Sequence, residues 1–202
     1  MHWFFRTRRM DWMQTFSGVQ YWPAAPRVQD VRIVDIAHHL SMLCRFTGAV
    51  RRFYSVAEHS VLVSHLVPPE HALCGLLHDA PEAYTNDISK PLKISLPDYK
   101  RIEALNWAAV AEKFGLPTKM PEEVHAADYV MLRTEQCTLM PHCEHTPAWA
   151  EHATDAVNIN CWAPEEAERQ FLARFYELTR GHGQAIMLSG HPILPLRDAV
   201  FA

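Results

Sequence analysis

Apolar residues recur at intervals of three and four along most of this chain, and that spacing predicts helices rather than strands. We predict helices over residues 34–46, 55–66, 69–84, 97–114 and 121–139, and a sixth from Pro164 onward. Residues 90–92 are predicted as a loop because proline interrupts a helix, and residues 141–162 as irregular. No convincing strand alternation is present, so the predicted fold class is all-α, a bundle of about six helices.

The length of the chain, 202 residues, fits one domain with an extension at either end. We assign residues 1–30 to an N-terminal extension, residues 31–181 to the helical domain and residues 182–202 to a C-terminal tail. Met10 and Met13 could equally be the true start, in which case the extension is shorter.

The pair His78-Asp79 follows an apolar run, residues 72–77, that has the composition of a buried helix segment. Burying a carboxylate without a partner costs several kcal/mol, and a divalent metal would offset that cost. Adjacent histidine and aspartate can offer one nitrogen and one oxygen to the same ion. Glu82 lies four residues after His78, so a continuing helix would place both on one face.

His59 is a second candidate ligand. Ser55 and Glu58 have the spacing of a capping box, which predicts a helix that begins at Ser55. In that helix His59 shares a stripe with apolar residues three, four and seven positions later, so it faces inward. An inward histidine on its own is more often a core side chain bonded to a carbonyl. Beside His78-Asp79, the ligand role is favoured.

Asp128 is a third candidate. The helix predicted over residues 121–139 opens with proline and acidic residues, and Asp128 lies on its stripe with Val124 and Met131. Leu132 could instead shift the apolar face and leave Asp128 at the surface.

The four side chains would supply two nitrogens and two oxygens from three helices: His59, His78, Asp79 and Asp128. That set suits Mn, Co, Fe, Ni or Zn, with positions left for water and substrate. We therefore expect one divalent transition metal as the cofactor.

The segments around these residues, 54–60 and 76–83, have the order H…HD…D and resemble the HD-domain metal-dependent phosphohydrolases. The likeness is greatest to the YfbR/YfdR-type 5'-deoxynucleotidase branch. It runs from Thr15 to Leu132, more than half of the chain, and does not cover the tail after residue 182. The resemblance implies that the predicted bundle is a single HD domain around a metal site.

The resemblance also implies roles for individual residues. The metal would be held by the same four side chains: His59, His78, Asp79 and Asp128. Glu82 matches the acid beside the attacking water, and Asp87 matches a second acid near the site. Arg45 matches the arginine that binds the substrate phosphate, and Lys90 and Lys93 are further candidates for phosphate contact.

The implied activity is hydrolysis of a nucleotide phosphate ester, with a nucleotidase converting deoxynucleoside 5'-monophosphates to deoxynucleosides and phosphate. The alternative is a deoxynucleoside triphosphate triphosphohydrolase, which a set of basic residues keeps open: Arg51, Arg52, Lys90, Lys93, Lys100 and Arg101. A third alternative is a non-catalytic metal-bound nucleotide sensor. Its signature would be loss of Glu82 or Asp87, and both are present.

Composition adds bounds on partners and location. A formal charge of −4 argues against a polymeric nucleic-acid partner, so we expect a small nucleotide instead. Five cysteines at irregular spacings imply no disulfide framework, which suits the cytoplasm. No apolar stretch is long enough to span a membrane, and no secretory signal is evident. We also expect a homo-oligomer, a dimer or larger.

Two other clusters are alternative candidates for a site. The first contains metal-type side chains between residues 142 and 152: His142, Cys143, His145 and His152. Structural zinc sites usually show a second ligand pair, which is missing, so we interpret this segment as a polar surface loop. The second is the arginine run at residues 6–9, which we interpret as solvated.

Overall fold

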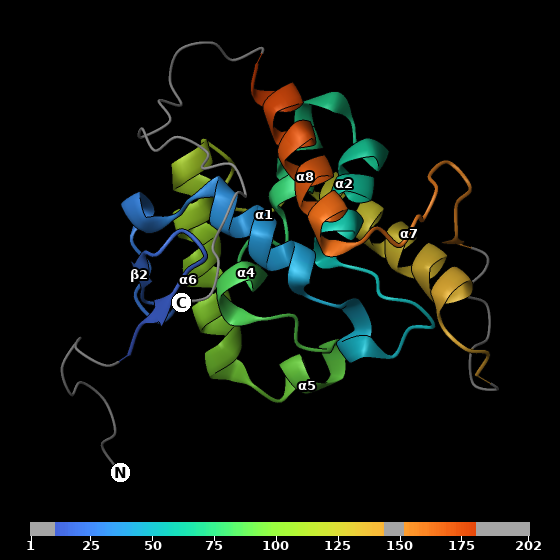
Figure 1. Cartoon of the computed structure of the whole chain (residues 1–202), viewed down its shortest axis with the longest axis horizontal. Helices are drawn as coiled ribbons and strands as arrows, with labels where there is room; N and C mark the ends of the chain where they lie inside the picture. Colours follow the sequence, from blue (N-terminus) through green and yellow to red (C-terminus); the bar gives the residue numbers. More distant parts are fainter. Residues whose placement is uncertain (1–10, 144–151, 181–202) are drawn as a thin grey trace, which may run out of the picture.

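The computed structural model describes residues 11–143 and 152–180, and over these the protein is mostly helical, as predicted (Figure 1). Its α-helices are α1 (Ile33–Met42), α2 (Val56–Leu66), α3 (Ala72–Leu77), α4 (Glu82–Thr85), α5 (Lys90–Ile94), α6 (Pro97–Phe114), α7 (Glu122–Leu139) and α8 (Pro164–Thr179). Short 3-10 helices are η1 (Val28–Asp30), η2 (Arg45–Gly48) and η3 (Pro69–His71). The strands β1 (Met13–Gln14) and β2 (Gln20–Tyr21) pair antiparallel.

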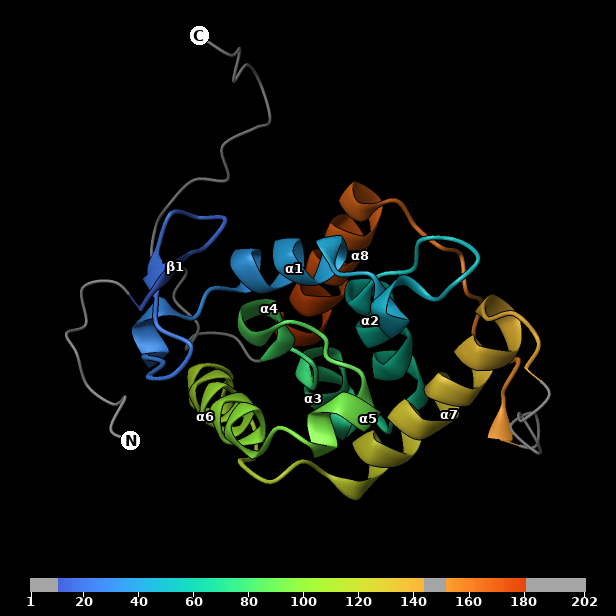
Figure 2. The ribbon, with the colours of Figure 1, turned by 90° about the horizontal axis from the view of Figure 1, so that it is seen from below.

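Helix α2 is the centre of the structure. It packs against α1, α3, α7 and α8, and every side chain from Val56 to Ser64 is buried. Figure 2 shows α2 between α1 and α7. A helix that is buried on all sides places even its polar residues in the interior, which is why the first turn of α2 can carry a buried site.

Two apolar clusters surround this central helix. The larger joins α1, α3 and α8 through residues such as Leu40, Leu77 and Phe171, all fully buried. Tyr21 of the hairpin belongs to it and stacks on Tyr84, with ring centroids 3.8 Å apart. The smaller cluster joins α2, α3 and α7. The helices that carry the candidate ligands are therefore held together by apolar packing.

Three of the predicted helices are confirmed within one or two residues, namely α2, α6 and α7, and α8 begins at Pro164 as predicted. Gly115 ends α6 in the left-handed conformation, with a φ of 68°. The described residues between 141 and 162 contain no α-helix or strand, in agreement with the prediction.

The first predicted helix, residues 34–46, is too long. Helix α1 ends at Met42, and Cys44 then pairs with Ser55 as an isolated antiparallel bridge. Phe46 and Thr47 have φ values of 56° and 54°, which a helix cannot accommodate. Arg45 therefore lies in a turn beyond the helix rather than near its end, and its backbone N–H donates to Tyr54.

The helix predicted over residues 69–84 is divided into η3, α3 and α4. Between α3 and α4 the chain makes tight turns, in which the N–H of Ala80 donates to Leu77 and the N–H of Glu82 to Asp79. Pro81 has no N–H to continue a helical ladder, which accounts for the break. The expectation that His78 and Glu82 share one continuous helix face is wrong.

One smaller prediction also needs correction. Residues 90–92 are predicted as a loop, but they begin α5, with Pro91 in the first turn where its missing N–H costs nothing. The two short strands form a hairpin that turns at Gly18, with a φ of 80°, and are consistent with the all-α class. No helix within residues 11–143 and 152–180 is long and apolar enough to cross a membrane. The predicted domain boundaries remain predictions.

Candidate metal centre

Helix α2 supplies His59, whose side chain is fully buried. The predicted cap at its start is confirmed in part, because the Ser55 hydroxyl accepts the N–H of Glu58 at 3.1 Å. The Glu58 carboxylate does not complete the capping box. It accepts three consecutive backbone N–H groups ahead of α8, those of Asn160, Cys161 and Trp162. Glu58 thus ties the helix that carries His59 to the segment leading into α8.

His78 follows the last residue of α3, and its position depends on how closely α3 approaches α2. Gly75 makes that approach possible, since a Cβ there would meet Val67 at 3.1 Å and the Ser64 Cα at 3.3 Å. The His78 ring is oriented by its Nδ1, which lies 2.8 Å from the carbonyl oxygen of Gly75 and donates to it. Its Nε2 is left facing His59.

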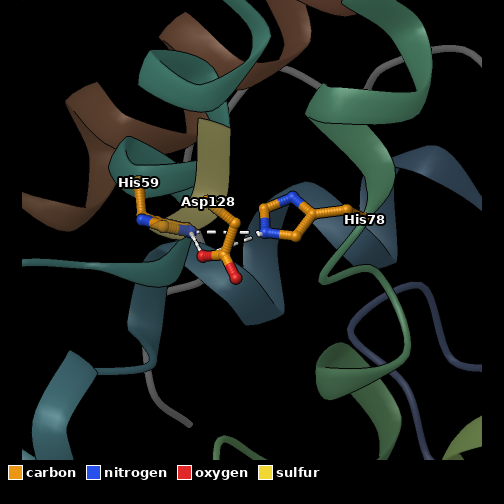
Figure 3. A group of neighbouring side chains, drawn as sticks. All are labelled: His59, His78 and Asp128. Carbon is orange, nitrogen blue, oxygen red and sulfur yellow. Dashed lines mark hydrogen bonds and ion pairs between the residues drawn. The ribbon is translucent and has the colours of Figure 1, made fainter. Parts of the chain in front are cut away.

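The side chains of His59, His78 and Asp128 point toward one another from α2, the end of α3 and α7 (Figure 3). One ligand atom from each lies within 4.8 Å of the others, so the group could hold a metal ion. The two Nε2 atoms are 3.3 Å apart, and Asp128 Oδ1 is 3.1 Å from His59 Nε2 and 3.8 Å from His78 Nε2.

Asp79, the fourth predicted ligand, also faces this group. Its Oδ2 lies 3.2 Å from His78 Nε2 and 3.6 Å from His59 Nε2. A metal bound at about 2.1 Å separates neighbouring ligand atoms by about 3.0 Å in an octahedron and about 3.4 Å in a tetrahedron. The separations of 3.1 and 3.3 Å within the group of His59, His78 and Asp128 lie in this range, so these three side chains could hold one transition metal, and Asp79 lies beside them. The structure thus brings together all four residues that the sequence predicted as ligands.

The charges of the group are mutually compensated. Burial acts to raise the pKa of Asp79, but the charge and hydrogen bond of His78 outweigh it and hold that pKa at about 2. Burial likewise acts to raise the pKa of Asp128, and hydrogen bonds from His59 and His78 lower it well below its usual value. Both acids are therefore ionised, and the histidine protons occupy the place that a cation would take.

One side of the group is open. The Asp128 side chain is 42% exposed, whereas His59 is fully buried. A cavity of about 210 Å³ adjoins His78 and Asp79 and is also lined by Glu82, Lys100 and Trp107. Water and a small substrate could therefore reach the side of the group that these residues line.

Glu82 lies at the first turn of α4 and is 6% exposed. Its Oε1 accepts a hydrogen bond from Lys93 Nζ at 3.2 Å, and the same nitrogen lies 2.6 Å from Glu103 Oε1. The other oxygen, Oε2, is buried without a hydrogen-bond partner among the described residues. Burial, followed by the negative charges of Asp79 and Asp87, raises the pKa of Glu82 well above its usual value.

The remaining predicted residues divide into those near the group and those away from it. Asp87 is half-buried, and burial raises its pKa while the nearby Arg45 acts to lower it. Arg45 is buried, with Nη1 3.6 Å from Asp79 Oδ2. Lys93 reaches Glu82, as described above. Lys90 is exposed at the start of α5, and its predicted contact with phosphate stays a prediction.

Glu135 is the neighbour to which the sequence analysis gave no role. It is fully buried on α7, and its carboxylate accepts hydrogen bonds from His59 Nδ1, Arg45 and Tyr54. A signal was present, because Glu135 lies seven residues after Asp128 on the same inward stripe. A buried acid on that stripe requires a cationic or hydrogen-bonding partner.

A second cavity, of about 620 Å³, is lined by residues of the hairpin, α1 and α4. Phe16, His38, His39 and Met42 line it together with Glu82. The Phe16 ring is 56% exposed and stacks on His38, with centroids 3.7 Å apart. This cavity offers flat and apolar side chains, in contrast to the charged cavity beside Asp79.

The surface-loop interpretation of the second histidine cluster is partly testable. His142, Cys143 and His152 are exposed, as expected for a polar loop. His145 lies outside the described residues, as does the arginine run at residues 6–9.

The fold and the site define a mostly helical protein with a histidine–aspartate group that could hold a metal ion. No protein-family model matches the chain. It is 44% identical over 177 residues to the uncharacterized protein YfdR of Escherichia coli, an alignment covering 84% of this chain and 97% of that protein. An uncharacterized protein of Rhodobacter capsulatus is 32% identical over 188 residues, covering 84% and 96%. The chain belongs to the same family as Escherichia coli YfdR.

Proposed function

We propose that the protein is an HD-domain metal-dependent phosphohydrolase that acts on nucleotides, and that its reaction converts deoxynucleoside 5'-monophosphates to deoxynucleosides and phosphate. The observation that carries the proposal is the convergence of four ligand side chains beside a buried glutamate. Two histidines and two aspartates meet from three parts of the fold, and Glu82 lines the same cavity as two of them.

His59, His78, Asp79 and Asp128 would hold one divalent transition metal. When bound, such an ion lowers the pKa of a coordinated water and polarises a phosphoryl oxygen. The two aspartates already carry negative charge in this structure, because their pKa values lie below the usual range. The chain therefore presents ionised oxygens to the ion, which would displace the protons on the two Nε2 atoms as it binds.

Glu82 takes the proton of the attacking water. Burial and the charges of Asp79 and Asp87 raise the pKa of this carboxyl, which makes it a stronger base than an exposed glutamate. Oε1 accepts a hydrogen bond from Lys93, which orients the group, and the buried Oε2 has no hydrogen-bond partner among the described residues, so it has room to accept a proton. Lys93 and Glu103 form the remainder of this hydrogen-bonded chain.

Arg45 stabilises charge on the phosphoryl group. A guanidinium has five N–H donors, and Glu135 engages those on Nε and Nη2. Nη1 faces Asp79, at the edge of the metal-ligand group, and can turn its donors to a phosphate oxygen. Asp87, whose pKa burial raises, would deliver a proton to the leaving oxygen.

A nucleotide fits the space around Glu82. Small-molecule sites have volumes of about 300–1,000 Å³, and the cavity of about 620 Å³ beside the hairpin falls in that range. Its exposed Phe16 offers an aromatic face for a base. Arg45 and Lys93 are each paired with carboxylates already, so fewer free cations remain for a triphosphate, which favours the monophosphate.

The test is a substrate panel on protein stripped of metal and then supplied with Mn²⁺, Co²⁺, Fe²⁺, Ni²⁺ or Zn²⁺. Deoxy- and ribonucleoside monophosphates and deoxynucleoside triphosphates are incubated with each form, and released phosphate and triphosphate are measured separately. We expect metal-dependent release of phosphate from deoxynucleoside monophosphates. Release of intact triphosphate would establish the alternative activity. Metal binding without hydrolysis of any nucleotide would contradict both and favour the sensor.

A further inference from the structure

Glu135 is a fully buried carboxylate whose two oxygens are both occupied. Oε1 accepts from His59 Nδ1 at 2.6 Å and from the Tyr54 hydroxyl at 2.9 Å. Oε2 accepts from Arg45 twice, from Nε at 3.1 Å and from Nη2 at 2.9 Å. An ionised carboxylate has about four acceptor sites, so all of them are used.

The contact with His59 has a chemical consequence. An ionised carboxylate can only accept a hydrogen bond, so the Nδ1 of His59 must carry the proton that is shared with Glu135. The Nε2 of a neutral imidazole is then the atom with the lone pair. That Nε2 is the atom that lies within 3.1–3.6 Å of Asp128, His78 and Asp79.

The same carboxylate also determines the position of Arg45. With Nε and Nη2 directed to Glu135, the guanidinium presents Nη1 to Asp79 Oδ2 at 3.6 Å. Glu135 therefore contacts one candidate metal ligand directly and a second through one arginine. Asp128 and Glu135 are seven residues apart on α7. This helix therefore contributes one candidate ligand, Asp128, and also the carboxylate that contacts a second candidate ligand, His59.

We propose that Glu135 is a positioning residue for the metal centre: it fixes the proton of His59 at Nδ1, keeps Nε2 free for a metal, and holds Arg45 against Asp79. The inference rests on the proposed function for the presence of a metal, but it does not depend on which substrate is hydrolysed. Carboxylates behind a ligating histidine orient the ring and raise its basicity, and their loss typically lowers metal affinity by about 10–100-fold.

A purely structural role would also explain a buried ion pair, so the test needs two matched variants. Glu135→Gln keeps the size of the side chain. With its carbonyl toward Arg45, its amide would donate to His59 Nδ1 and favour the proton at Nε2, which blocks the ligand atom. Tyr54→Phe removes a hydrogen bond from the same oxygen of Glu135 but leaves the contact with His59 intact.

The measurements are zinc affinity by competition with a chelator and the unfolding temperature of the metal-free protein. Glu135→Gln should lower zinc affinity by about 10–100-fold. Tyr54→Phe should lower the unfolding temperature but change zinc affinity by less than about threefold, because the His59 contact is kept. A third measurement needs no variant: in the zinc-loaded wild type with ¹⁵N-labelled histidine, His59 should carry a slowly exchanging proton on Nδ1.

The outcomes separate this inference from the proposed function. If the wild-type chain binds no zinc, the metal centre and the inference fail together. If it binds zinc and Glu135→Gln binds equally well, the inference alone fails. If both variants lose affinity in proportion to their loss of stability, Glu135 is structural. An unprotonated Nδ1 in the zinc-loaded wild type overturns the inference even where Glu135→Gln does not fold.

Discussion

The two sides of the candidate site differ in how firmly they are held. On the side formed by α2 and α7, His59 and Glu135 are fully buried, and each is hydrogen-bonded to the other. On the side formed by α4 and α5, none of the residues of α5 is buried, and Glu82 has an oxygen without a hydrogen-bond partner among the described residues. Lys93 joins α5 to Glu82.

This difference suits the two sides of the site to two different roles, metal binding and proton transfer. Metal ligands need fixed positions, and side chains packed in a core with satisfied hydrogen bonds provide them. A group that exchanges a proton needs an acceptor atom that is not already hydrogen-bonded. It also needs a neighbouring cation that can move from the carboxylate to an incoming phosphate. The α2–α7 side therefore fits metal binding and the α4–α5 side fits proton transfer. The predictions below test that division, from the largest expected effect to the smallest.

The largest effect is expected at the metal ligands. His78→Ala should abolish both bound metal and phosphohydrolase activity, because it removes one of two nitrogen ligands. Metal content after reconstitution and the rate on the best nucleotide are the measurements. His125→Ala, an exposed histidine on α7, is the matched control and should keep both. Full activity of the wild type after complete chelation would contradict the metal assignment.

The second effect separates proton transfer from metal binding. Glu82→Gln should keep the metal and lower kcat by about 10² or more, the usual scale for loss of a general base. Glu103→Gln, which changes the other acid paired with Lys93, should cost less than about tenfold. If Glu82→Gln loses the metal instead, Glu82 is a ligand, and metal binding is not confined to the α2–α7 side of the site.

The convergence of the candidate ligands His59 and Asp128 could be predicted from the sequence, because periodicity indicates which residues of a helix face the core. Each lies on a stripe with a residue that the structure buries, Leu62 for His59 and Met131 for Asp128. Glu135 lay on the same stripe as Asp128, but its role depends on Arg45 and Tyr54, which approach from elsewhere in the chain. Such long-range pairs leave no local pattern.

The break between α3 and α4 has a local cause, because Pro81 cannot donate the N–H that a continuing helix requires. The apolar run before it fits a continuing helix as well as one that ends, so periodicity alone does not locate the break. Likewise, the left-handed Phe46 and Thr47 follow directly on the bridge between Cys44 and Ser55, and periodicity predicts neither feature. The position of Arg45 therefore required the structure.

The third effect is a shift in pH dependence. Lys93 lowers the pKa of Glu82, so Lys93→Met should raise that pKa further. A base must be deprotonated to act, and activity therefore rises as pH passes upward through its pKa. The acid limb of the kcat profile should move to higher pH in Lys93→Met. Lys90→Met, an exposed lysine on the same helix, should leave the limb in place. An unchanged limb in Lys93→Met would remove Glu82 from the role of base.

The smallest effect is expected on the surface of α5. Leu92 is 51% exposed, so Leu92→Ser should change the free energy of unfolding by no more than about 0.5 kcal/mol. Leu77→Ala, in the core beside the candidate metal ligand His78, should cost about 2–5 kcal/mol because it leaves a cavity. Urea denaturation of the metal-free protein at two protein concentrations measures both. A loss above about 1.5 kcal/mol for Leu92→Ser that grows with protein concentration would mean that α5 is buried against a second copy of the chain. In that case oligomer formation buries the α4–α5 side, and the two sides of the site differ in burial only in the monomer.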